Sequence, residues 1–306
     1  MIASHIGEFS ALITAIFWTF TAIAFTSSGK LIGSLSVNIW RLILGILFLG
    51  IFTTIRYGSP IPIGISVESW FWLGLSGFVG VFLGDLFLFK AFTITGPRIA
   101  LLVMSLAPPL AALISWFALG ETLTLMDFVG MIVTLSGISM VILMRKNGES
   151  TQNKKIKLRH EPIGIMYALI GAIGQASGLV MSKIGLQSDT NPFYGSEIRL
   201  FAGIFGFIIL ITYLKRWKPV LLSVKNKTAM GYLSIGAFFG PFLGISLSLY
   251  AVQHANPGVV QTIISINPVL IIPLSMWLYK DKITLREAIG ALVAVIGVSL
   301  FFVTLS

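Results

Sequence analysis

Asp85 is an acidic residue inside a long apolar run, directly after Gly84 and a little over one turn before the run ends. If that run crosses a membrane, burying the acid costs about 2.5–3.5 kcal/mol, so its side chain should face a cavity or a partner. Asp85 therefore either binds a proton or a cationic group, or pairs with a cation of the chain, such as Arg41, Lys90 or Lys183. The residues alone leave both interpretations open.

Arg41 and Arg199 lie near the starts of two further apolar runs. A guanidinium fork matches the geometry of a carboxylate or a phosphate, so both arginines are candidates for holding an acidic substrate group. The alternative is structural, because long basic side chains at this depth can reach the headgroups or pair within the protein.

Polar and aromatic residues elsewhere in the apolar runs are further candidates for the wall of a substrate cavity. They are Thr14, Trp18, Thr19, Ser105, Trp116, Gln175, Gln261, Ser265 and Asn267. An aromatic face beside amide and hydroxyl groups suits an amphipathic metabolite. The alternative is that these residues only pack between helices or sit at the membrane interface.

The sequence shows no hydrolase triad, metal-ligand cluster or phosphate-binding loop. The chain has no cysteine, and His5, His160 and His254 lie at the ends of runs or in loops without clustering. We therefore expect no catalytic residue, no metal site and no cofactor, and we expect that the chain is not an enzyme.

The composition is that of a membrane protein. Hydrophobic residues make up 56% of the 306 residues and charged residues 10%, with a mean hydropathy of +0.94; soluble domains carry roughly 25% charged residues. The net charge of +10 does not indicate nucleic-acid binding, because the basic residues lie at the ends of apolar runs and in two loops.

A helix needs about 20 mostly apolar residues to cross a bilayer, and about ten such runs follow one another. They cover residues 9–27, 37–55, 70–89, 99–118, 125–144, 163–186, 192–214, 230–251, 258–279 and 285–304. The runs are continuously apolar, which favours helices over strands. The first run lacks a basic n-region and a cleavage pattern, so we expect it to be retained.

Residues 80–137 recur without a gap at 240–297. The matches include Phe82-Leu83-Gly84 with Phe242-Leu243-Gly244, Ser105 with Ser265, Pro108 with Pro268, Gly130 with Gly290 and Gly137 with Gly297. A fainter match joins Arg41 to Arg199. We therefore predict an all-α membrane protein with ten transmembrane helices as two five-helix repeats, at residues 1–144 and 162–306, joined by a basic linker at 145–161.

Five helices is an odd number, so the second repeat should be inverted relative to the first. Cations gather in the linker and in the loop after the seventh run, while the loops after the fourth and eighth runs hold none. The positive-inside rule then places these two basic segments in the cytoplasm and both termini outside.

Matched motifs predict local structure in both repeats. Gly80-x3-Gly84 and Gly240-x3-Gly244 allow close helix packing. Thr124 with Asp127, and Thr284 with Glu287, fit a capping box.

Proline interrupts the fourth and ninth runs. Pro108, Pro268 and Pro273, with Pro109, each leave a helical carbonyl without its donor. Matched interruptions of this kind indicate a central site or hinge, with a simple packing kink as the alternative.

The whole pattern resembles the drug/metabolite transporter superfamily and, within it, the EamA-like permeases. The resemblance rests on motifs that occur in both halves. They are Ala91…Gly96-Pro97 and Ala251…Asn256-Pro257, Ser-x-x-Pro at 105–108 and 265–268, a turn acid at Glu121 and Asp281, and Gly-x6-Gly in the last helix.

This resemblance implies a secondary transporter of the cytoplasmic membrane, often an exporter of amino acids, related metabolites or drugs, with a central cavity between the halves. Two features depart from the pattern. Lys280 replaces the glycine before the second turn acid. The first-helix glutamate through which the smallest relatives couple to protons has no counterpart, because Glu8 lies at the very start of the first run.

We therefore predict a transporter that moves a small metabolite by alternating access, as a monomer or homodimer, with protons as one candidate for the coupling ion. A membrane-embedded enzyme acting on lipid-linked groups and a passive facilitator are the alternatives.

Overall fold

The computed structural model of the protein describes residues 5–94, 100–101, 103–144, 162–186, 190–267, 269–273 and 285–302, and all regular structure in these ranges is helical. The first part contains α1 (Ile6–Ile32), α2 (Ser34–Tyr57), α3 (Val67–Ser76), the π-helix η2 (Gly77–Gly84), α4 (Asp85–Ile94), α6 (Ala107–Leu119) and α7 (Leu125–Met144). The second part contains α8 (Pro162–Gly185), α9 (Pro192–Tyr213), α10 (Trp217–Ser223), α11 (Lys227–Ala237), the π-helix η3 (Phe238–Gly244), α12 (Ile245–His254), α13 (Pro257–Ile264) and α15 (Leu285–Leu300).

Seven helices of the described chain are long and apolar enough to cross a membrane: 6–32, 34–57, 67–91, 125–142, 162–185, 192–213 and 227–254. Shorter apolar helices at 107–119, 257–273 and 288–300 occupy the predicted fourth, ninth and tenth runs. The chain is therefore a multi-pass helical membrane protein. The short helix α10, in the basic loop after the seventh run, was not predicted from the sequence.

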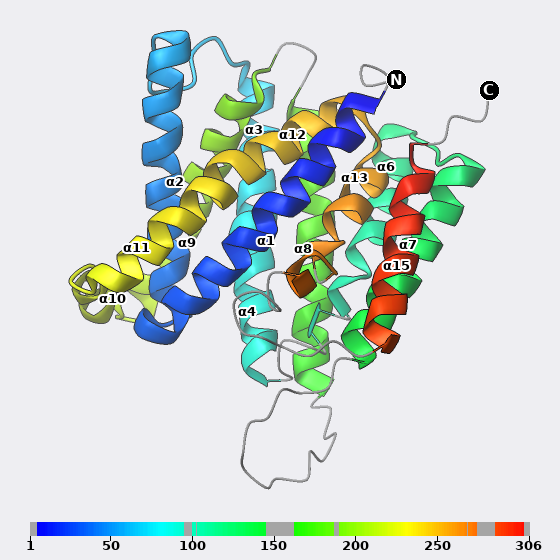
Figure 1. The fold of residues 1–306 in the computed structure, drawn as a ribbon. Helices are drawn as coiled ribbons and strands as arrows, with labels where there is room; N and C mark the ends of the chain where they lie inside the picture. The colour runs from blue at the N-terminus through cyan, green and yellow to red at the C-terminus, as the bar shows by residue number, and fades with distance from the viewer. Residues whose placement is uncertain are drawn as a thin grey trace, which may run out of the picture.

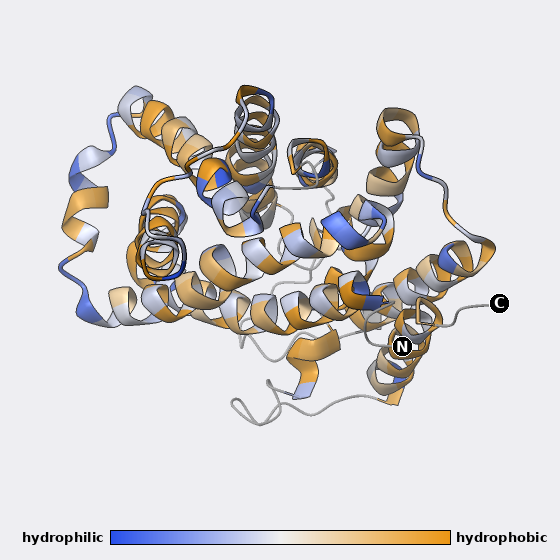
Figure 2. Cartoon of the chain, turned by 90° about the horizontal axis from the view of Figure 1, so that it is seen from above, coloured by the Kyte–Doolittle hydropathy of each residue, from blue (hydrophilic) through white to orange (hydrophobic). Residues whose placement is uncertain are grey.

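The helices form one bundle, in which the described chain begins and ends at the same end, beside the marks N and C (Figure 1). The end of α7, the start of α8 and the helix α10 lie toward the opposite end (Figure 1). Hydrophobic residues cover the helices, and hydrophilic residues gather in connections such as those flanking α10 (Figure 2).

The outer faces of the helices suit contact with lipid. In α2, Leu47, Ile51 and Ile55 follow one another at intervals of four residues and are 53%, 53% and 81% exposed. This spacing places them on one face of the helix. Such a continuous apolar face is stable in a bilayer, because lipid tails surround it instead of water.

Between α1 and α2 the chain reverses direction through a single residue. Gly33 has φ 78° and ψ 156°, a conformation that is in effect reserved for glycine. Its N–H donates to the carbonyl of Gly29, which closes α1, and its own carbonyl accepts from the N–H of Val37 at the start of α2.

Glycines allow α7 and α15 to pack at very short range. A Cβ atom on Gly130 would lie 3.2 Å from the carbonyl oxygen of Gly297, and one on Gly137 would lie 2.6 Å from that of Gly290. Because an early glycine of α7 meets a late glycine of α15, and the reverse, the two helices are antiparallel. The matched glycines of these two helices therefore serve close helix packing.

The third and eighth apolar runs each contain a π-helix, which the sequence analysis did not anticipate. In both runs the π-helix ends at the matched glycine, Gly84 or Gly244, and an α-helix follows at once. The π-helix η2 packs against α8 and α9, whereas η3 packs against α1 and α2. Each π-helix therefore contacts helices from the other half of the chain.

The interruption of the fourth run lies just before the prolines. Ser105 and Leu106 form a turn, in which the N–H of Leu106 donates to the carbonyl of Val103. Pro108 then occupies the first turn of α6, where a missing N–H is tolerated. The ninth run has the matched turn at Ser265 and Ile266, followed by a helical stretch that contains Pro273.

The first predicted capping box is confirmed. The N–H of Thr124 donates to Asp127 Oδ2 over 3.0 Å, and the N–H of Asp127 donates to Thr124 Oγ1 over 3.1 Å. Several other predictions lie outside the described residues, namely those for Gly96-Pro97, the linker 145–161, Pro268, Lys280, Asp281 and the second capping box.

The seam between α7 and α15 yields a stability prediction. Gly137→Ala places a methyl group against backbone atoms of α15, and such overpacking costs about 1–3 kcal/mol. We expect a lower melting temperature of the purified protein in detergent. Gly74→Ala and Gly231→Ala are the matched controls, because nothing lies within 4 Å of a Cβ atom at either position. Equal melting temperatures for all three variants would contradict the proposed seam.

Candidate functional site

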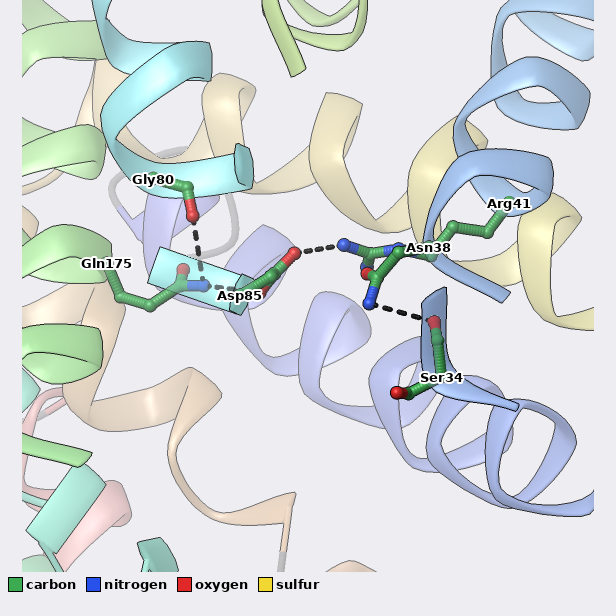
Figure 3. Close-up of polar contacts among 6 residues, drawn as sticks. All are labelled: Ser34, Asn38, Arg41, Gly80, Asp85 and Gln175. Carbon is green, nitrogen blue, oxygen red and sulfur yellow. Dashed lines mark hydrogen bonds and ion pairs between the residues drawn. The ribbon is translucent and has the colours of Figure 1, made fainter. Parts of the chain in front are cut away.

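Asp85 is the first residue of α4, directly after the π-helix η2, and its side chain is 14% exposed. One carboxylate oxygen, Oδ2, forms an ion pair with Nη2 of Arg41, whose side chain is 4% exposed (Figure 3). Of the three cations that the sequence offered as partners, the structure therefore selects Arg41. Further hydrogen bonds to the remaining atoms of such a pair help to offset the cost of removing it from water.

Gln175 of α8 satisfies the second carboxylate oxygen. Its side-chain Nε2 donates to Asp85 Oδ1 over 2.8 Å and also approaches the carbonyl oxygen of Gly80 at 3.4 Å (Figure 3). The acid is thus held from two sides, by an arginine of α2 in its own half of the chain and by an amide of α8 in the other half.

Arg199 of α9 also approaches the π-helix η2, beside α8. A Cβ atom on Gly80 would lie 3.4 Å from Nη2 of Arg199, and Nη1 donates to Ser182 Oγ over 3.4 Å. Arg199 is 6% exposed and forms no ion pair with any described residue.

The group formed by Arg41, Asp85, Gln175 and Arg199 is called the central polar cluster below. It carries two guanidinium groups and one carboxylate. The Nε atoms of both arginines are buried without a hydrogen-bond partner, as is Oδ1 of nearby Asn38, which donates through Nδ2 to the carbonyl of Ser34 (Figure 3). The cluster therefore has an excess of positive charge and spare donors, which suits binding of an acidic group.

Lys183, near the end of α8, forms a second polar contact, or tie, between the halves. Its ammonium group forms an ion pair with Glu121 in the α6–α7 turn and donates to the carbonyl of Ala255 over 2.8 Å. Glu121 also accepts from Ser115 Oγ over 2.8 Å. Lys183 is therefore engaged with the turn acid rather than with Asp85. The third candidate, Lys90, lies 5.0 Å from the ring centre of Tyr167.

A third contact between the halves uses Asn267, whose Oδ1 accepts from Thr19 Oγ1 over 3.0 Å. Trp18 precedes Thr19 on α1 and faces the second π-helix, since a Cβ atom on Gly244 would lie 3.4 Å from its indole Nε1.

Two other predicted cavity residues, Thr14 and Ser265, form hydrogen bonds within their own segments of the chain. Thr14 is buried and donates to the carbonyl of Ser10 in its own helix, and Ser265 does the same to Gln261, which is partly buried. Ser105 lies in the turn that interrupts the fourth run. Trp116 is 52% exposed and stacks on Phe117.

Sequence analysis missed two features of the interior. The carbonyl of Gly80 is an acceptor that only the packing reveals. Glu197, by contrast, is an acid inside the seventh run and, like Asp85, needs a cavity or a partner if its run crosses a membrane. The structure buries it completely. Among the described residues, no group of three or more His, Cys, Asp or Glu side chains is placed to hold a metal ion.

Known proteins resemble this chain over both halves. The sequence model of the EamA-like transporter family matches residues 5–143 and 162–303. An uncharacterized transporter of Buchnera aphidicola is 30% identical over 146 residues, which cover 48% of this chain and 46% of that protein. The uncharacterized transporter YetK of Bacillus subtilis is 24% identical over 265 residues, 86% of this chain and 76% of that protein.

Two further relatives bear on the architecture. An uncharacterized protein of Methanocaldococcus jannaschii is 24% identical over 140 residues, which are 46% of this chain but 96% of that protein. A solved crystal structure superimposes with a TM-score of 0.72 at 20% identity and covers 97% of this chain and 96% of its own, which shows a shared fold.

The match of the family model to nearly the whole chain, on a helical membrane fold with a polar cluster between its two halves, means that this protein belongs to the EamA-like transporter family.

Proposed function

We propose that the chain is a secondary transporter that carries a small metabolite across the cytoplasmic membrane by alternating access, through ten membrane-crossing segments in two inverted five-helix repeats. The observation that carries this proposal is the position of Asp85, a buried acid tied to both halves at once. A carrier needs polar contacts between its halves that can be exchanged for contacts with a substrate.

Matched contacts support the inverted repeat. A Cβ atom on Gly45 of α2 would meet Leu200 of α9 and Pro241 of η3. The corresponding glycine of the second half, Gly203 of α9, would meet Leu42 of α2 and Val81 of η2. Exchanging the halves converts one set of contacts into the other, which is the relation expected from a two-fold axis between them.

The antiparallel pairing of α7 with α15 has the same origin, because these helices occupy equivalent places in the two halves. The archaeal relative adds a length argument. Its 140 matched residues are nearly all of that protein and only 46% of this chain. A unit of about half this length therefore exists as a separate chain, as expected if the longer chain arose by duplication.

The orientation follows from the arrangement of the cations. Lys218 lies in α10, and Lys215, Arg216, Lys225 and Lys227 lie beside it, at the end of the bundle opposite to both ends of the described chain (Figure 1). The positive-inside rule makes that end cytoplasmic and places both termini outside. Since both repeats belong to one chain, a monomer would be a complete transporter.

During alternating access, the two polar ties between the halves would open in turn. Gln175 joins Asp85 on the side of η2, while Lys183 joins Glu121 where α8 ends. α8 contributes to both ties and runs from the cytoplasmic end toward the outer end. Opening one tie while the other is kept would expose the interior to one side of the membrane only.

The central polar cluster also limits the substrate. Asp85 suits an ammonium group, whereas Arg199 and the spare donor of Arg41 suit a carboxylate. We therefore favour small zwitterionic metabolites such as amino acids, or amphipathic compounds of similar size. Export is favoured over import through the family resemblance. The site is asymmetric, because it has an excess of donors and because Ile245, the residue equivalent to Asp85, is not an acid.

The direct test is counterflow in liposomes that contain the purified protein. Labelled amino acids, nucleosides, sugars and cationic drugs would be added to vesicles loaded with an excess of each unlabelled compound. We expect saturable uptake and counterflow for at least one zwitterionic compound. Uptake without saturation or counterflow would indicate a passive facilitator, and absence of flux across the panel would contradict the proposal.

Cysteine labelling tests the inverted topology cleanly, because the chain has no cysteine of its own. Thr122→Cys marks the exposed α6–α7 turn and Lys218→Cys marks α10. In intact cells, a membrane-impermeant maleimide should label the first variant and should label the second only after permeabilisation. Labelling of both variants from the same side would contradict the topology.

A double-variant experiment separates the structural role of the ion pair from its transport role. Asp85→Leu leaves Arg41 buried without a counter-charge, which costs about 3–5 kcal/mol. Adding Arg41→Met should recover most of the lost thermal stability. We expect counterflow to stay at least tenfold below that of the wild type in the stable double variant. Recovery of both stability and counterflow would reduce the pair to a structural element.

A further inference from the structure

Glu197 is a buried acid that has no role in the transport cycle proposed above. It lies in the second turn of α9 and is 0% exposed. Thr53 Oγ1 of α2 lies 3.2 Å from Glu197 Oε1, and Oε2 has no hydrogen-bond partner. Because α2 and α9 belong to different halves of the chain, this carboxyl group lies at a contact between the halves.

No cation of the described residues neutralises Glu197. Among the elements that pack against α9, α2 carries Arg41, Arg56 and Tyr57, α3 carries Glu68, α12 carries Tyr250 and His254, and η2 and η3 carry no titratable group. On α9 itself, the titratable neighbours are Tyr194 and Arg199. No described basic group lies within ion-pair distance of Glu197.

Hydrogen-bond geometry indicates which protonation state fits this site. Thr53 Oγ1 is 3.2 Å from Glu197 and 3.3 Å from the carbonyl oxygen of Gly50, and a hydroxyl has only one hydrogen to donate. If Glu197 carries a proton, its O–H donates to Thr53, and Thr53 donates to Gly50. If Glu197 is ionised, Thr53 can donate to Oε1, because the carbonyl of Gly50 still accepts from Thr54 Oγ1 over 2.6 Å, but Oε2 then carries negative charge without any donor.

The cost of burial favours the same state. An ionised carboxylate with at most one hydrogen bond, held in an apolar interior, is far less stable than a neutral carboxylic acid. The ionised form becomes stable once water or a cation reaches it. A movement of α2 against α9 would provide that access, because Thr53 and Glu197 face each other across this contact.

We propose that Glu197 is a proton-binding site, protonated in the conformation described here and emptied when the halves move apart, and that it couples transport to a pH gradient. The coupling rests on the proposed transport function, whereas the protonation does not. In the ionised state Glu197 would also supply a second acid for the two arginines of the interior, Arg41 and Arg199, which Asp85 alone does not balance.

Infrared spectroscopy tests the protonation without any substrate. The purified protein in lipid nanodiscs should show a protonated-carboxyl C=O band at neutral pH that is absent from Glu197→Gln. Glu68→Gln is the matched control, because Glu68 is an exposed acid at the start of α3 and its loss should leave the band unchanged. Thr53→Val, which keeps the acid but removes its partner, should shift the band to higher frequency. A band that persists in Glu197→Gln would overturn the proposal.

Transport in liposomes tests the coupling, with the labelled compound of the panel that shows the fastest counterflow as probe. In the wild type, an imposed pH gradient should accelerate uptake severalfold. Glu197→Gln should keep counterflow within about twofold of the wild type, and its uptake with the gradient should fall to the rate measured without it.

The outcomes separate the two proposals. Loss of acceleration in Glu197→Gln, with the control Glu68→Gln still accelerated, supports coupling through Glu197. Equal acceleration in Glu197→Gln and wild type overturns it. A wild type that shows counterflow but ignores the gradient also overturns the coupling, while the transport function stands. Absence of counterflow in the wild type refutes the transport function itself, and the infrared band then decides the protonation alone.

Discussion

The close approach of η2 to α8 is the contact on which the central polar cluster depends. A Cβ atom on Gly178 would lie 2.7 Å from Cα of Gly80, and one on Gly174 would lie 3.0 Å from Cα of Gly84. Both helices therefore need glycine at their crossing. In lipid no hydrophobic force drives helices together, so such backbone contact supplies much of the stabilising van der Waals energy. The same short distance lets the side chain of Gln175 reach Asp85 and Gly80.

The π-helix η2 also determines where backbone and acidic groups lie at this crossing. A π-helix departs from the regular α-helical hydrogen bonding, and such segments often occur at functional sites. Here the carbonyl of Gly80 lies within reach of Gln175, and Asp85 begins the next α-helix with its carboxylate between Arg41 and Gln175. In a bilayer an irregular backbone is tolerated only where protein satisfies its polar groups, and Gln175 of α8 does so here for the carbonyl of Gly80.

Local sequence rules predicted the elements well and the long-range contacts less well. The boundaries of α7 and the capping box at Thr124 follow from hydropathy and from residues three positions apart, so the sequence was sufficient for them. The partner of Asp85 was narrowed to three cations, because charge balance requires a partner without locating it. The π-helices could not be predicted, since their geometry depends on how glycines of different halves meet. Glu197 carried the same signal as Asp85, an acid inside an apolar run, and could have been found from it.

The buried charges suggest why the two halves are similar but not identical. Duplication supplies the matched arginines, Arg41 and Arg199, but the acids are unmatched, since the residue equivalent to Asp85 is Ile245. A perfectly symmetric interior would give each arginine its own permanent counter-charge and would leave nothing to exchange. Asp85 is paired with Arg41, and Glu197 lies at a different contact. Under the two proposals above, the charge of the interior would therefore depend on whether a substrate group or a proton is bound. Because each buried charge is costly when it is unpaired, binding at one place changes the stability of the other. Polar groups in lipid must be satisfied by protein, and in the proposed transport cycle this requirement would link the movement of the halves to the movement of a substrate.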